Sequence, residues 1–182
     1  MGKIHFLRLV CAISFVILLY TCRLSIAGER FQPRGCEFSV EFPGKPTVVD
    51  IFNPTTGNVQ TAEYRGGSGK PSDSYFFVAE GMPISKTAIL AYHEDFNSFL
   101  LEGAQTYAEA NGLQHPEFKL FEDDLGKGIG MRAYKKIGGV PVIYSTMSLL
   151  GEKSIIHLRI GCAAEFFPPP GMTRFIKSVA RN

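Results

Sequence analysis

Three histidines, His93, His115 and His157, are the side chains of this sequence best suited to acid–base or metal chemistry. His93 opens a His-Glu-Asp triplet in a segment of helical spacing, where it would share a face with Asn97. The zinc-protease motif His-Glu-x-x-His needs a second histidine at the position of Asn97, so that geometry fails. A hydrolase would need a site assembled from one of these histidines and carboxylates distant in the sequence. The alternative for the triplet is a solvated or helix-breaking polar patch.

Two loops contain residue types that bind ions in other proteins. Residues 122–124 are Glu-Asp-Asp, but they lack the alternate spacing and the distant Glu of an EF-hand calcium loop. Residues 126–130, Gly-Lys-Gly-Ile-Gly, lack the spacing of a phosphate-binding loop, and no helical pattern follows them. No serine, cysteine or lysine lies in a recognisable nucleophile motif. A non-catalytic protein without a metal or cofactor is therefore favoured.

One strand offers a candidate contact surface. In the alternating run 156–162, His157 and Arg159 point to the face opposite Leu158 and Ile160. Gly161 continues the row of His157 and Arg159, so this face of the sheet is expected to be partly open. The alternative is that a helix covers the face or that water solvates it.

A second candidate contact surface follows that strand. Phe166 and Phe167 precede three consecutive prolines, residues 168–170. Because polyproline conformation is preformed, the two aromatic side chains could form a stiff recognition edge. They could instead plug the edge of the sheet while the prolines prevent edge-to-edge pairing.

Cys36 and Cys162 are the cysteines that follow residue 27. Cys36 opens the apolar face of one alternating segment and Cys162 closes the apolar face of another. If the two strands are antiparallel neighbours, both sulfurs meet in the core, and a disulfide is expected. The alternative is a pair of buried free thiols.

Alternating apolar residues and hairpin-short connections predict an α+β fold. It consists of one mainly antiparallel sheet of about seven strands, one long middle helix and a short C-terminal helix. The middle helix is expected over residues 87–111, with a bend near 93–95 because a straight helix of that length would exceed the diameter of the domain. The last helix carries Met172, Phe175, Ile176 and Val179 on one stripe.

Residues 1–27 have the features of a secretory signal. Lys3 and Arg8 precede an apolar stretch, and Ser25 and Ala27 provide small residues for cleavage before Gly28. Only 14 residues separate Arg8 from Arg23, too few to span a bilayer as a helix. Lipidation at Cys22 and an uncleaved anchor are the alternatives. A single domain over 28–182, secreted or periplasmic, is expected.

The charge of this expected domain is nearly neutral. Without Lys3, Arg8 and Arg23, the 19 basic residues become 16, against 17 acidic ones, for a net charge of −1. Such a balance gives no electrostatic argument for binding nucleic acid or anionic membranes. Membrane contact is expected only through the signal segment, if it stays uncleaved.

Two terminal motifs resemble a known class of exported bacterial proteins. The segment 38–46, Phe-Ser-Val-Glu-Phe-Pro-Gly-Lys-Pro, and the segment 174–179, Arg-Phe-Ile-Lys-Ser-Val, flank the middle helix. This arrangement is similar to the PsbP/Mog1-like α/β/α sandwich superfamily. The resemblance implies an accessory or binding protein and supplies no catalytic residue set.

Together these patterns predict an exported, non-catalytic, monomeric domain that binds a protein or a small apolar ligand. A lipid carrier is the first alternative, since the 13 phenylalanines after residue 27 could line a pocket. A hydrolase is the second. A carrier should contain a cavity of about 300–1,000 Å³.

Overall fold

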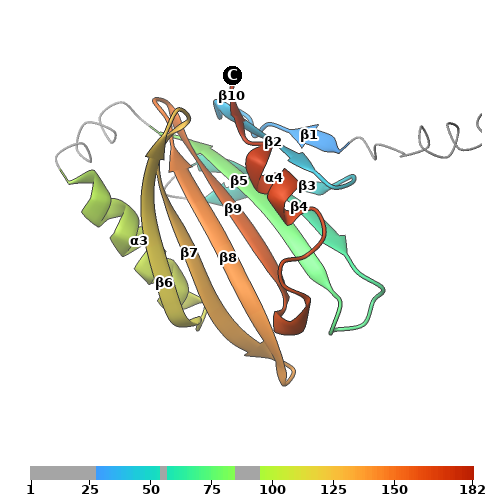
Figure 1. The fold of residues 1–182 in the computed structure, drawn as a ribbon. Coiled ribbons are helices and arrows are strands. Elements are labelled where there is room, and N and C mark those ends of the chain that lie inside the picture. Colours follow the sequence, from blue (N-terminus) through green and yellow to red (C-terminus); the bar gives the residue numbers. More distant parts are fainter. Residues whose placement is uncertain (1–27, 54–56, 85–94) are drawn as a thin grey trace, which may run out of the picture.

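The computed structural model describes residues 28–53, 57–84 and 95–182, and its main feature is a seven-stranded antiparallel sheet (Figure 1). The fold is α+β, as the sequence predicts. Across the sheet, the strands follow in the order β3 (Thr47–Asn53), β4 (Gly57–Gly66), β5 (Tyr75–Pro83), β9 (Ser154–Ala163), β8 (Val140–Leu150), β7 (Gly126–Ile137) and β6 (Gln114–Asp123).

A second, three-stranded sheet lies against the main one. It has the order β1 (Glu29–Phe31), β2 (Phe38–Phe42) and β10 (Ala180–Arg181). The strand expected from residues 36–42 therefore belongs to this small sheet rather than to a single large sheet. Its apolar side chains Phe38, Val40 and Phe42 are fully buried, because they pack onto the main sheet instead of lying beside it.

The short helix α4 (Met172–Lys177) completes this layer. The Phe175 ring lies 5.0 Å from the ring of Phe42 and 4.9 Å from that of Phe77, between centroids. This confirms that the C-terminal helix packs onto the core. We call the covered side of the main sheet, which carries Leu158 and Ile160, the packed face.

The opposite side of the main sheet, which carries His157, Arg159 and Gly161, is called the open face. Helix α3 (Phe96–Ala110) covers one part of it, beside β6 and β7 (Figure 1). Ala108 of the helix packs with Met131 and Ala133 of β7, and Leu100 packs with Ile129. Cover by a helix, one of the two alternatives for this face, is therefore present beside β6 and β7.

Local chemistry sets the ends of α3. The carboxylate of Asp95 accepts a hydrogen bond from the Ser98 N–H and caps the first turn. At the other end the chain leaves the helix at Asn111, and Gly112 has a φ of +61°. The expected bend near 93–95 coincides with this start, but residues 85–94 lie outside the described residues.

The predicted disulfide is wrong, because Cys36 and Cys162 are both free and buried. The Cys36 thiol lies 3.9 Å from the carbonyl oxygen of Ile155, at the start of β9, whereas Cys162 lies near the end of the same strand. Seven residues of strand separate these points by about 23 Å. The prediction required β2 and β9 to be neighbours, but β5 and β8 occupy both sides of β9.

Within the described residues, no helix combines the length and the apolar character needed to cross a membrane.

Candidate functional site

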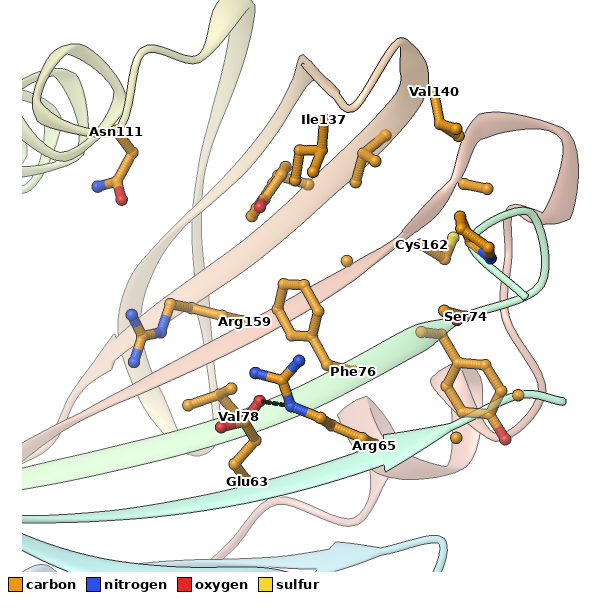
Figure 2. Close-up of a pocket in the computed structure, with 18 of the residues that line it drawn as sticks. Glu63, Arg65, Ser74, Phe76, Val78, Asn111, Ile137, Val140, Arg159 and Cys162 are labelled. Carbon is orange, nitrogen blue, oxygen red and sulfur yellow. Dashed lines mark ion pairs between the residues drawn. The ribbon is translucent and has the colours of Figure 1, made fainter. Parts of the chain in front are cut away.

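The open face contains a groove of about 900 Å³ where α3 leaves the sheet uncovered. Tyr107 and Asn111, at the end of α3, bound one side, and Val49 and Ile51 of the edge strand β3 bound the other. We call it the open-face groove. In Figure 2, Arg159 lies at one end of it and Val140 and Ser74 lie at the other.

The floor of the groove is apolar and depends on Gly161. The Phe76 ring of β5 lies across the backbone of Gly161 on β9, where any Cβ atom would collide with it. The same ring meets Tyr144 of β8 edge-on, with centroids 5.7 Å apart. Val78 and Val142 extend this surface along the neighbouring strands. Because position 161 is a glycine, the Phe76 ring can extend from β5 across β9 and contact β8, and it forms the floor of the groove over all three strands.

Polar groups gather at the Arg159 end of the groove. The Arg159 guanidinium donates to the carboxylate of Glu80 at 3.0 Å, and Glu80 stands directly opposite Thr61 in the pairing of β4 with β5. Arg159 Nε and Thr61 Oγ1 are both buried and have no hydrogen-bond partner among the residues that the structure describes. A second ion pair, between Arg65 and Glu63 at 2.6 Å, lies farther along the groove.

His157 lies between Ser148 and Glu80, which stand opposite it on the two strands that flank β9. Its Nδ1 lies 2.7 Å from the Ser148 hydroxyl of β8, and Glu80 is its cross-strand neighbour on β5. Burial, and secondarily the positive charge of Arg159, lower the pKa of His157 to about 4. The imidazole is therefore neutral at physiological pH, and it is a half-buried group whose ring hydrogen-bonds with the Ser148 hydroxyl.

The other two histidines do not join His157. His115 lies on β6, the far edge strand, where it is exposed and has a φ of +50° beside a shift in register. His93 lies outside the described residues. Within the described part of the chain, no group of three or more His, Cys, Asp or Glu side chains could hold a metal ion.

The two predicted aromatic contact residues lie away from the groove, at one end of the packed face. Phe166, in the short helix η1 (Ala164–Phe166), stacks on Tyr75 with centroids 6.1 Å apart. The Arg132 guanidinium lies 4.7 Å from the centre of the Phe167 ring. The structure therefore separates these aromatics from His157 and Arg159, and only Arg159 lines the open-face groove.

Sequence reasoning missed Thr61, Phe76, Glu80 and Tyr144. A signal was present in part, because Phe76 and Glu80 have the same parity along β5 and therefore share a face. That alternation does not show which strands lie beside β9. It therefore did not identify the residues that contact Arg159 and Gly161 on the neighbouring strands.

Comparison with known proteins identifies a fold and no more. Neither a protein-family model nor a curated protein matches the chain. One similar solved structure is that of PA94 from Pseudomonas aeruginosa, a protein of unknown function described as a putative regulator. Its TM-score is 0.50 at 8% sequence identity, and the match covers 76% of this chain and 99% of PA94. The cyanobacterial PsbP (CyanoP) of Synechocystis sp. PCC 6803 has a TM-score of 0.51 and 12% identity, with coverage of 88% and 96%. The chain thus resembles PsbP at the level of its fold, as the terminal motifs predict.

Proposed function

We propose that this protein is an exported, non-catalytic binding domain that holds a small apolar ligand in the open-face groove. The observation that carries the proposal is the groove itself, which has an apolar floor and polar side chains such as Arg65, Asn111 and Arg159 around it. Its volume of about 900 Å³ falls within the range of small-molecule sites.

The side chains around the groove favour an apolar occupant. Phe76, Val78 and Val142 form its floor, and Val49 and Ile51 are about half exposed at its rim. Burying such surface against a ligand stabilises the complex by about 25 cal/mol for each Å² removed from water. The Tyr107 and Tyr144 rings add flat aromatic surface on the side of α3.

Export is supported by the sequence alone. The basic start, the apolar stretch and the small residues before Gly28 are typical of a cleaved secretory signal. We therefore place the binding domain in the periplasm or outside the cell, after cleavage behind Ala27.

Two neighbouring valines of β3 provide a matched test. Val49 lines the groove and is 48% exposed, whereas Val48 is 47% exposed and points to the other face of the sheet. Binding of a neutral apolar dye such as Nile red should weaken about tenfold in Val49→Arg and stay unchanged in Val48→Arg. Equal binding by the two variants, with unchanged melting temperatures, would refute the groove as the site.

A second candidate function, the binding of an extended protein segment, has its own observation. Among the described strands β3 is an edge strand, paired only with β4, and it has exposed apolar residues on both faces, among them Ile51 and Phe52. An extended segment can add to such an edge through main-chain hydrogen bonds.

Site-specific photocrosslinking distinguishes this second candidate. A photoreactive phenylalanine at Phe52 should capture a partner protein in cells, while the same group at Leu120, on the opposite edge strand β6, should not. Capture at neither position, or at both alike, would argue against binding at β3.

A further inference from the structure

We infer that the ligand of the open-face groove carries a neutral hydrogen-bond acceptor, such as an amide or ester carbonyl, which binds at the end of the groove lined by Arg159 and Thr61. This inference rests on the proposed function and adds the chemical class of the ligand. Its basis is the polar end of the groove, where two buried donors have no partner.

The inference starts from two buried hydrogen-bond donors that have no partner among the described residues. Thr61 is only 6% exposed, and within residues 28–53, 57–84 and 95–182 its hydroxyl has no hydrogen-bond partner. Arg159 Nε is buried in the same way, although its Nη2 donates to Glu80. A buried polar group left unpaired costs about 1–3 kcal/mol, so nearly all such groups in folded proteins find a partner. Both residues line the groove, and an acceptor that enters it can supply the missing bonds.

The charges at this end select against an ionic ligand. Arg159 is paired with Glu80 at 3.0 Å and Arg65 with Glu63 at 2.6 Å, so the two cations are already balanced by two carboxylates. A ligand carboxylate would lose its hydration and meet Glu63 and Glu80, while a ligand cation would offer no acceptor to the unpaired donors. A neutral carbonyl accepts hydrogen bonds without either penalty.

The rest of the groove fixes the shape of the ligand. From Arg159 the floor continues over Phe76 toward the rim near Val140 (Figure 2). The two buried donors at the Arg159 end, and the apolar floor formed by Phe76, Val78 and Val142, match an amphiphile with a neutral head and an aliphatic or aromatic body.

Three probes that share one chain and differ in the head group test the inference on the protein purified from a secretory host. They are N,N-dimethyldecanamide, decanoate and decyltrimethylammonium, measured by displacement of Nile red at pH 7.5. The amide should bind about tenfold more tightly than decanoate, and the ammonium should bind most weakly. Equal affinities for the three, or tighter binding of decanoate, would overturn the inference.

The variant Thr61→Val separates ligand recognition from structure. Valine has nearly the shape of threonine but no hydroxyl, so the variant should bind the amide about tenfold more weakly and yet melt at a higher temperature than the wild type. Thr47→Val, an exposed change on β3, is the control and should alter neither quantity. Unchanged amide binding by Thr61→Val would contradict the inference.

The two proposals fail in distinguishable ways. If none of the probes displaces Nile red and the dye itself does not bind, the proposed function fails. If the dye and all three probes bind without preference for a head group, the groove remains a binding site and only the assignment of the neutral acceptor is wrong.

Discussion

The ring of Phe76 lies across the backbone of Gly161 on the neighbouring strand, in the space that a side chain at position 161 would occupy. This relationship joins β5 to β8, because the same ring contacts Tyr144. It also creates the flat apolar floor of the open-face groove. A glycine in the interior of a strand normally weakens the strand, and here it permits a close aromatic contact.

The variant Gly161→Ala should therefore reduce both stability and binding. The added methyl group displaces the Phe76 ring, and a local overpacking of this kind costs about 1–3 kcal/mol in the free energy of unfolding. Urea denaturation measures the loss. Gly103→Ala is the control, since a Cβ there meets no atom within 4 Å and Gly103 lies within α3. That variant should gain about 1 kcal/mol, and a larger loss at 103 than at 161 would contradict the packing described.

Stability should fall as the pH is lowered from about 6.5 to 4 because of His157. The unfolded histidine titrates near pH 6.5, whereas the pKa of His157 in the folded protein is about 4. In this window the unfolded state binds more protons, so acid favours unfolding, by about 3 kcal/mol in total. Below pH 4 both states are protonated and this contribution stops changing.

Replacing the imidazole isolates this effect. His157→Asn removes the titrating group, so its unfolding free energy should vary less than that of the wild type between pH 6.5 and 4, as measured by denaturant titration at each pH. Identical pH profiles for His157→Asn and wild type would show that His157 is not held neutral by burial.

Glu37 connects the two sheets and should be sensitive to substitution. Its carboxylate is 8% exposed and accepts bonds from Arg181 Nε and the Lys153 N–H, both at 2.7 Å. Burial alone would raise the pKa of Glu37, but these hydrogen bonds and the Arg181 charge lower it overall. The charged carboxylate therefore stabilises the fold above its unfolded pKa near 4.5, and this contribution is lost as the pH falls through the lower folded value.

The variant Glu37→Gln should lose about 2 kcal/mol of stability at pH 7, because the hydrogen bonds to a charged group are weakened. Glu152→Gln is a suitable control. That carboxylate contacts the same guanidinium at 2.8 Å but is 76% exposed, so its loss should be within about 1 kcal/mol. If Glu37→Gln and Glu152→Gln lost the same free energy of unfolding in urea titrations, the proposed role of Glu37 in connecting the two sheets would be contradicted.

Both cysteines should behave as buried thiols. Burial raises the pKa of Cys162 to about 11 and also raises that of Cys36, so neither forms a reactive thiolate at neutral pH. Iodoacetamide should modify both only after unfolding, and a reducing agent should leave the melting temperature unchanged. A native mass two daltons below that of the dithiol form, or rapid labelling of the folded protein, would be inconsistent with this placement.

The local sequence pattern predicted which side chains share a face of a strand or helix. It did not predict the order of the strands in the sheet. Strict alternation placed His157, Arg159 and Gly161 on one face, and the helical stripe through Phe175 predicted its packing onto the core. The disulfide failed because the alternation around Cys36 gives the buried face of a strand but not its neighbour. For the same reason the sequence did not identify Thr61, because its position opposite Glu80 depends on the order of the strands in the sheet.

Titration of the amide probe into ¹⁵N-labelled protein, followed by NMR, tests binding in the open-face groove most directly. Chemical-shift changes should concentrate at the groove amides, including Thr61, Phe76, Tyr144 and Gly161, with small changes at Phe38 and Val40 beneath the packed face. Shift changes centred on the packed face, or none at saturating probe, would contradict binding in the open-face groove.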